Sequence, residues 1–303
     1  MALPMSDPPV PGDWSRHTAT SDPGAHGPLV EAVAPDPAAI GRVGRNVIAH
    51  YRAQAPDLPE ETRDDIHLRW LADQLAEDQR RHGTPLAEPR PVGARLQGCC
   101  RDHTLLAVGV LRHHGVPARS RVGFAGYIQD GWHYDHVVPE YHDGERWRRF
   151  DPEIAPEFGM LPDPHDLEQG PTAPFQTAAE VFTLMRAGEL DPASYGVAPG
   201  LPFAGERFVV AEVFWEVAHR YGDELLLWDG WGAVPPVDED VPTDVLRLVE
   251  EVASLLLAAD ADEPEAERRL YERYCEDARL HPGTEVLRFS PYGDPPVVVR
   301  LRD

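Results

Sequence analysis

The stretch Gly98-Cys99-Cys100-Arg101-Asp102 decides the fold, together with Asp135-His136-Val137-Val138 and Phe150-Asp151-Pro152 further along the chain. The first motif carries two adjacent cysteines, the second a histidine and the third an aspartate. A thiol, an imidazole and a carboxylate are the groups of a nucleophile, its base and the residue that orients the base. If the folded chain brings them together, they predict chemistry on acyl groups through a thiolate.

The elements around these motifs predict an α+β fold. Residues 102–114 are rich in leucine and valine at helical spacing, and Gly115-Val116-Pro117 is typical of a helix end. The β-branched and aromatic residues that follow predict three strands, at 118–127, 135–142 and 146–150. The sequence therefore predicts a helix next to the cysteines and an antiparallel sheet, and a helix bearing the cysteine would face the His–Asp hairpin if it packs on that sheet.

The dipeptide Asp143-Gly144 predicts a tight turn between the second and third of these strands. A two-residue turn there would place His136 directly opposite Asp151, with Cβ atoms about 5 Å apart. At that distance the aspartate could accept the imidazole N–H. Pro139 has no N–H for the ladder, so it requires an edge position or a bulge, and a bulge would shift the register by one residue.

A cysteine at the start of a helix is favoured as a reactive thiolate. The helix N-terminus carries a partial positive charge and N–H groups without intrahelical partners, which stabilise a thiolate and could bind the oxyanion of a tetrahedral intermediate. Gln97 and Trp132 are candidates for an additional side-chain donor to that oxyanion. Arg119 is a candidate for binding a substrate carboxylate, although a structural ion pair is the more common role of such an arginine.

The composition excludes several classes of protein. A net charge of −24 would repel the phosphates of a nucleic acid. No apolar run is long enough to span a membrane, and the N-terminus lacks the features of a secretory signal, so a cytoplasmic location is expected. The three cysteines are too few for a disulfide framework and form no Cys-x-x-Cys pair for zinc. We therefore expect no metal, cofactor, nucleic acid or membrane partner.

Several motifs, in order, resemble the transglutaminase-like superfamily, which shares the papain-like arrangement of Cys, His and Asp. The pattern has a Gly-x-Cys start to a helix, a Gly-Val-Pro-Ala-Arg turn, a strand that bears the histidine, and Asp-Pro after a strand that bears a tryptophan. The matching residues are Gly98-Cys99-Cys100, Gly115-Val116-Pro117-Ala118-Arg119, Asp135-His136, and Trp147 followed by Asp151-Pro152.

This resemblance implies that Cys100 is the nucleophile, His136 the base and Asp151 the residue that orients the base. One departure is Val138, because an aromatic residue often stands two positions after the histidine of the family. The rest of the chain resembles the larger bacterial proteins that carry this domain.

The chain divides into three parts by composition and periodicity. Residues 1–28 are rich in Pro, Gly, Ser and Asp and predict a disordered segment. Residues 29–240 are expected to form the transglutaminase-like domain with helical additions, with its motif core at 91–152. Residues 241–303 predict a helical C-terminal extension. The expected helices outside the motif core span 36–52, 60–82, 177–187, 207–221, 243–259 and 263–278, and a further strand is expected at 295–301.

Three hypotheses about function follow. The first is a cysteine acyltransferase that passes an acyl group from a small molecule or peptide to an amine or to water. The second is a cysteine peptidase or amidohydrolase, which differs from the first only in the acceptor. The third is a non-catalytic binding or scaffold protein that retains the fold. Reaction of the Cys100 thiol with iodoacetamide at neutral pH would separate the third hypothesis from the other two.

Overall fold

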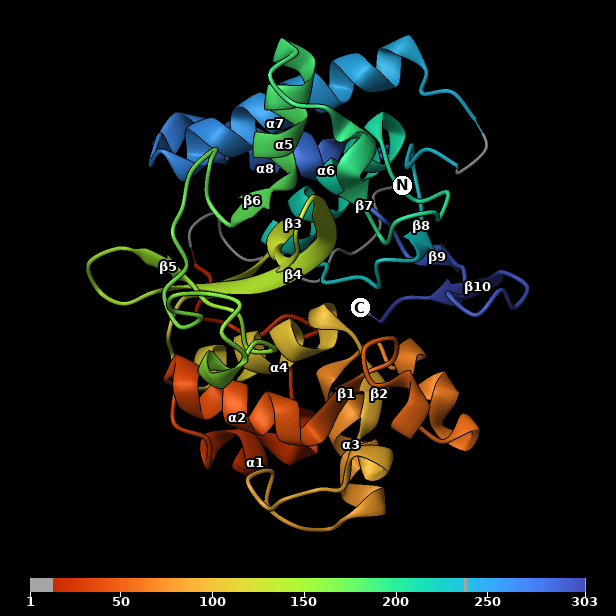
Figure 1. Cartoon of the computed structure of the whole chain (residues 1–303). Helices are drawn as coiled ribbons and strands as arrows, with labels where there is room; N and C mark the ends of the chain where they lie inside the picture. The colour runs from red at the N-terminus through yellow and green to blue at the C-terminus, as the bar shows by residue number, and fades with distance from the viewer. Residues whose placement is uncertain (1–12, 237–238, 303) are drawn as a thin grey trace. The chain divides into compact units, whose positions relative to one another are not determined.

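The computed structural model describes residues 13–236 and 239–302, and the chain folds as two compact units (Figure 1). We call the first the cysteine unit; it contains Asp13–Ser120 and Val137–Leu167. We call the second the helical unit; it contains Arg121–His136 and the described residues from Glu168 onward. Helices and mostly antiparallel strands confirm the predicted α+β class. Because both units are discontinuous in sequence, the predicted division at residue 240 stays a prediction.

The core of the cysteine unit surrounds α4 (Cys100–His113), in which every residue except the last is buried. A helix that is buried all round needs neighbours on several sides. Here they are α1 (Gly27–Glu31), α2 (Pro37–Val47) and α3 (Leu71–Arg81). The apolar side chains of this core include Val30, Ile40, Val43, Leu71, Leu75, Leu105, Leu106, Val110, Leu111 and Phe150.

Two short parallel strands position the start of α4. β1 (Ile48–His50) follows α2 directly, and β2 (Leu96–Gly98) leads into the cysteines. Their register pairs His50 with Gly98. The helix predicted at 36–52 is therefore shorter than expected, because its last residues pair with β2 instead.

The helix predicted at 60–82 is interrupted. A 3-10 helix, η3 (Glu60–His67), and a short extended segment precede α3. The carbonyls of Leu68 and Arg69 accept hydrogen bonds from the Arg101 guanidinium, at 3.5 and 2.5 Å. Because these carbonyls bond to a side chain rather than to N–H groups four residues on, a continuous helix does not form.

The largest sheet contains the long strands β3 (Ala118–Gln129) and β4 (Trp132–His142), and its strand order is β5-β4-β3-β6, with β7 paired to β4. Each long strand has one end in each unit. In the cysteine unit, β4 pairs with β5 (Trp147–Arg149). In the helical unit, β3 pairs with β6 (Phe175–Thr177) and β4 with β7 (Tyr195–Gly196). The three strands predicted after α4 are therefore present.

The register between β4 and β5 differs from the prediction by two residues. Glu140 lies opposite Arg149, and their side chains form an ion pair at 2.8 Å. Continued along the chain, this register places Asp151 opposite Val138. The predicted direct pairing of Asp151 with His136 is therefore wrong.

The shift arises in the turn, which is longer than the Asp143-Gly144 dipeptide predicts. The Asp143 carboxylate accepts the backbone N–H groups of Glu145 and Arg146, both at 2.8 Å, so the loop has four residues. Pro139 is not the cause, because its carbonyl accepts the Phe150 N–H at 3.3 Å and the pairing continues past it.

Four helices form most of the helical unit: α5 (Ala178–Ala187), α6 (Glu206–Arg220), α7 (Thr243–Asp260) and α8 (Pro264–Glu276). They pack against one another (Figure 1) and lie close to the predicted ranges. A separate three-stranded sheet contains β8 (Asp229–Gly230), β9 (Glu285–Arg288) and β10 (Val297–Arg300), in the order β10-β9-β8.

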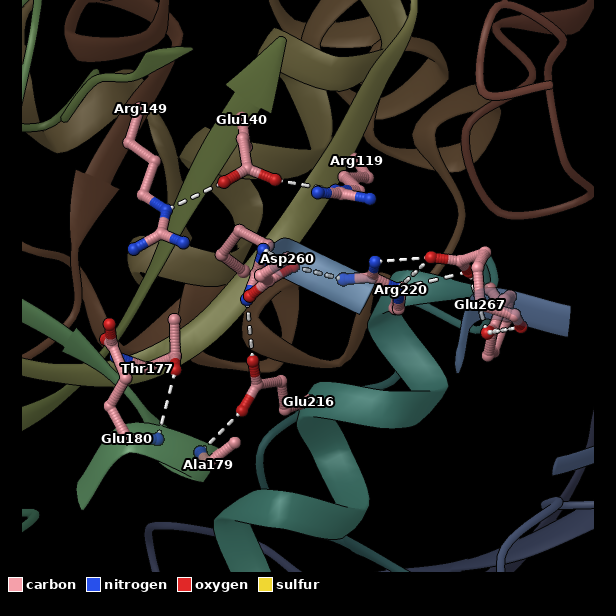
Figure 2. Close-up of polar contacts among 12 residues, drawn as sticks. Arg119, Glu140, Arg149, Thr177, Ala179, Glu180, Glu216, Arg220, Asp260 and Glu267 are labelled. Carbon is pink, nitrogen blue, oxygen red and sulfur yellow. Dashed lines mark hydrogen bonds and ion pairs between the residues drawn. The ribbon is translucent and has the colours of Figure 1, made fainter. Parts of the chain in front are cut away.

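A buried ionic cluster joins the elements of the helical unit (Figure 2). Arg121 of β3 contacts Glu216 of α6 at 2.9 Å and Asp260 of α7 at 2.5 Å. Arg220 of α6 contacts Asp260 at 2.8 Å and Glu267 of α8 at 2.5 Å. Each buried guanidinium therefore has two carboxylate partners, as a charge in an apolar interior requires.

Ordered structure begins before residue 29, whereas the composition predicts disorder up to residue 28. The first twelve residues lie outside the described part of the chain. Trp14 is buried, and its carbonyl accepts the Ala118 N–H at 3.0 Å. A 3-10 helix, η1 (Gly24–His26), leads into α1. Residues 13–28 therefore form part of the cysteine unit, contrary to the predicted disorder of that part of the segment.

Candidate active site

The two adjacent cysteines occupy different positions at the start of α4. Cys99 is the N-cap residue, with an extended backbone (φ −137°, ψ −171°), and Cys100 is the first helical residue. Both are buried free thiols. A hydrogen bond with the Cys100 thiol lowers the pKa of Cys99, but burial and the Asp102 carboxylate together outweigh it, so the pKa of Cys99 lies above its ordinary value. At neutral pH Cys99 therefore forms little thiolate.

The carboxylate of Asp102 is the centre of a buried hydrogen-bond network beside these thiols. It accepts the Cys99 N–H at 2.8 Å, the Gln74 side-chain amide at 2.8 Å and the Arg101 guanidinium at 3.0 Å. Gly98 is needed there because a Cβ atom would lie 2.8 Å from an Asp102 carboxylate oxygen. The motif Gly98-Cys99-Cys100-Arg101-Asp102 is thus one packed unit.

The first turn of α4 is anchored to β4 next to His136. The Thr104 hydroxyl donates to the Val137 carbonyl at 2.8 Å, and both residues are buried in the cysteine unit. Thr104 lies one helical turn after Cys100, and Val137 is joined to His136 by a peptide bond. This hydrogen bond therefore joins the first turns of α4 to the part of β4 that lies in the cysteine unit.

The imidazole of His136 is buried, with 3% of its surface exposed. It belongs to the helical unit, as that unit's last residue on β4. Its ring lies edge-on to two aromatic rings, with centroid distances of 6.1 Å to Tyr127 of β3 and 6.5 Å to Phe175 of β6. These contacts limit the orientations of the imidazole.

The carboxylate of Asp151 is buried in the cysteine unit, with 1% of the residue exposed. One oxygen, Oδ1, accepts the backbone N–H groups of Glu153 at 2.9 Å and Ile154 at 3.3 Å. The Asp151 N–H donates to the Pro164 carbonyl at 2.8 Å. Both ends of the loop that follows are thus hydrogen-bonded to Asp151: its start to the carboxylate and its end to the backbone N–H. These bonds fix the position of the carboxylate.

The two candidates for a side-chain oxyanion donor are engaged elsewhere. The Gln97 amide nitrogen donates to the Pro59 carbonyl at 2.7 Å and to the Thr62 hydroxyl at 2.9 Å. The Trp132 indole N–H donates to the Gly196 carbonyl at 3.1 Å. In this conformation, both side chains stabilise the fold rather than present donors to a substrate.

The side chain of Arg119 forms a structural ion pair. Its guanidinium contacts Glu140 at 2.6 Å, and Glu140 also binds Arg149 (Figure 2). The guanidinium lies over the rings of Trp14 and Trp147, at 4.7 and 4.1 Å from their centroids. This buried arrangement accounts for the charge of Arg119 without a substrate carboxylate.

Sequence reasoning did not predict the roles of Gln74, His103 and Thr104. His103 follows Cys100 on α4 and is buried, and burial lowers its pKa to about 4 although the charges of Glu153 and Asp151 act to raise it. Its Nδ1 has no hydrogen-bond partner among the described residues. All three side chains lie on buried positions of helices, where helical spacing gives no signal that distinguishes a polar contact from packing.

The family comparison agrees with this arrangement of motifs. Residues 52–152 match the family model of the transglutaminase-like superfamily. This match covers one third of the chain and shows what that segment is similar to. The match includes Cys100, His136 and Asp151 and confirms the resemblance inferred from the motifs.

Other comparisons add little to the transglutaminase-like assignment. No curated protein matches the chain. A crystal structure of a candidate cysteine protease from Cytophaga hutchinsonii is similar over 50% of this chain and 45% of its own, with 18% sequence identity and a TM-score of 0.32. The chain therefore spans less than half of that protein.

The described residues were also compared with the requirements of a metal site and of a membrane-spanning helix. They contain no group of three or more His, Cys, Asp or Glu residues that could hold a metal ion. Within the same residues, no helix has the length and apolar character to cross a membrane.

Proposed function

We propose that this chain is a cysteine-dependent acyltransferase that forms an acyl thioester on Cys100 and passes the acyl group to an amine or to water. In this proposal, His136 is the base and Asp151 orients its imidazole. The acyl donor is a small molecule or a peptide with an amide or thioester carbonyl, and the reaction takes place in the cytoplasm without a metal or cofactor.

The observation that carries the proposal is the anchoring of α4 to β4. Thr104, one turn after Cys100, is bonded to the carbonyl of the residue that follows His136. The register of β4 and β5 brings Asp151 opposite Val138, two residues along the strand from His136. Within the cysteine unit, α4, which carries Cys100, and the segment that carries Asp151 are thus both hydrogen-bonded to β4, and this supports the assignment of the three residues to one mechanism.

In the first half of the reaction, His136 accepts the thiol proton of Cys100, and the sulfur attacks the carbonyl carbon of the donor. A C–S bond forms, and the carbonyl electron pair moves to oxygen. When this oxyanion collapses, the bond to the leaving nitrogen or sulfur breaks, and His136 returns the proton to the leaving group. In the second half, an amine or water attacks the thioester, His136 takes its proton, and Cys100 leaves as a thiol.

We assign the oxyanion to the backbone N–H of Cys100 at the start of α4. Further along the first turn, the N–H groups of Asp102 and His103 donate to the Cys99 carbonyl at 2.9 and 3.3 Å. A donor at the first helical position lies next to the attacking sulfur, and the helix dipole also favours negative charge there.

The proposal is tested by trapping the acyl-enzyme. Wild-type protein is incubated with a library of amide and thioester donors, and peptides that contain Cys100 are searched for mass additions. Cys100→Ala should abolish the adduct and lower turnover by about 10⁴-fold or more, whereas Cys99→Ser should keep both. Turnover that survives in Cys100→Ala would refute the mechanism. Once a donor is found, the ratio of amide to acid formed with added amine distinguishes transfer from hydrolysis.

A further inference from the structure

The adjacent thiols of Cys99 and Cys100 raise the question of what makes only one of them reactive. The motif resemblance selects Cys100 but gives no physical reason for the difference. The backbone gives one, because Cys99 is held extended as the N-cap while the helix begins at Cys100. The carboxylate of Asp102 accepts the Cys99 N–H at 2.8 Å and so fixes which residue is the cap.

We propose that Asp102 is a positioning residue that holds Cys99 as an unreactive helix cap and leaves Cys100 as the single nucleophilic thiol. This inference rests on the proposed role of Cys100. Asp102 itself does not touch the substrate; it acts through the backbone and thiol of Cys99.

The partners of Asp102 hold its carboxylate in one place. Gln74 of α3 donates to one oxygen, and the same oxygen accepts the Arg101 guanidinium. The other oxygen accepts the Cys99 N–H. The side chains of Arg101 and Asp102 are 1% and 5% exposed, so solvent screens this charge weakly.

The fixed negative charge acts on the neighbouring thiol as well as on the backbone. A hydrogen bond with the Cys100 thiol lowers the pKa of Cys99, but burial and then the Asp102 charge outweigh it and keep this pKa above its ordinary value. A protonated thiol is a poor nucleophile. The same carboxylate therefore sets the geometry of the cap and suppresses the chemistry of the capping residue.

The test measures which thiol is alkylated. Wild-type protein and Asp102→Asn are treated with iodoacetamide over a range of pH, and fragmentation of the labelled peptide assigns the label to Cys99 or Cys100. Cys275 of α8, a half-buried free thiol in the helical unit, serves as the internal reference for reagent activity. The wild type should be labelled at Cys100. In Asp102→Asn, the Cys100-to-Cys99 labelling ratio should fall about tenfold, the change that one unit in a thiol pKa produces.

Asp78→Asn is the matched control. Asp78 lies in the same unit and forms an equally buried ion pair with Arg90 at 2.7 Å, but it does not contact the start of α4. If Asp102 were only a structural carboxylate, both variants would change the labelling ratio to the same extent. The inference requires the ratio to change in Asp102→Asn and to stay at the wild-type value in Asp78→Asn.

The outcomes separate this inference from the proposed function. If wild-type Cys100 is not labelled, the proposed nucleophile is wrong. If wild-type Cys100 is labelled and the ratio is unchanged in Asp102→Asn, the role of Asp102 is wrong and the nucleophile stands. The wild-type pH profiles give a test that needs no variant: labelling of Cys99 should begin at higher pH than labelling of Cys100, and equal midpoints would overturn the inference.

Discussion

Replacement of Glu212 with Gln should stabilise the protein increasingly as the pH rises. Glu212 lies in α6 and is 1% exposed. Neither of its carboxyl oxygens has a hydrogen-bond partner among the described residues. Burial, followed by the nearby charges of Asp135 and Glu216, raises the pKa of Glu212 well above its ordinary value. The folded protein therefore holds a proton on this group at pH values where the unfolded chain has released it.

The magnitude follows from proton linkage. Between pH 4.5, the ordinary pKa of the group, and its folded pKa, the unfolded chain has lost a proton that the folded protein keeps. Over that range the unfolding free energy falls by about 1.4 kcal/mol per pH unit. Every two pH units over which the folded protein alone keeps this proton thus cost the wild type about 3 kcal/mol. Gln has the shape of the protonated acid and no such dependence.

The assay is urea unfolding of the wild type and Glu212→Gln at intervals between pH 4 and pH 8. The difference between their unfolding free energies isolates Glu212 from all other titrating groups. This difference should be constant below pH 4.5 and then grow in favour of the variant. Glu206→Gln is the control, because Glu206 begins the same helix and its side chain is 54% exposed. A difference for Glu212→Gln that does not change with pH would refute the reasoning.

Three further predictions concern the surroundings of Cys100. Thr104→Val should cost about 1–3 kcal/mol of stability, because the buried Val137 carbonyl loses its donor, and should slow alkylation of Cys100; an unchanged alkylation rate would show that the anchor does not position the thiol. His103→Gln should remove a loss of stability that the wild type shows on acidification. The pKa of His103 in the folded protein is about 4, below the ordinary 6.5, so the unfolded chain binds the proton first. The unfolding free energy of the wild type therefore falls by about 1.4 kcal/mol per pH unit from pH 6.5 to pH 4. Parallel pH profiles of the two proteins would contradict this. Gly98→Ala should lower the urea midpoint by the equivalent of about 1–3 kcal/mol, because the new Cβ would lie 2.8 Å from both Asp102 and Ile48; a wild-type midpoint would contradict the close approach.

Local sequence signals predicted the elements of the cysteine unit well where the structure depends on neighbours in the chain. The helix that begins at Cys100 and the strands after it follow from apolar spacing and a Gly-Val-Pro stop. The interruption of the helix predicted at 60–82 could not be predicted in this way. It depends on the Arg101 guanidinium, which reaches the Leu68 and Arg69 carbonyls from more than thirty residues away.

The candidate site shows the same limit. Its three predicted residues lie in motifs with a recognisable order, so the sequence alone was enough to propose them. The engagement of Gln97 by Pro59 and Thr62 depends on contacts between distant segments, and so does the ion pair of Arg119 with Glu140. The orphaned carboxyl of Glu212 gave no signal either, because almost every residue of α6 is buried and its pattern does not separate a polar site from packing.

The predicted register of the hairpin is wrong by two residues, and the size of this shift decides which face of the strand carries Asp151. A dipeptide such as Asp143-Gly144 marks a turn but does not fix its length, and the Asp143 side chain extends the loop to four residues by capping two N–H groups. Side chains alternate between the faces of a strand with a period of two, so a shift by two residues moves Asp151 along the strand and leaves it on the same face. A shift by one residue, as from a bulge at Pro139, would have turned its carboxylate to the opposite face from His136. The proposed pairing of these residues as orienter and base therefore depends on the parity of the register, which the continued hydrogen bond from Phe150 to Pro139 preserves.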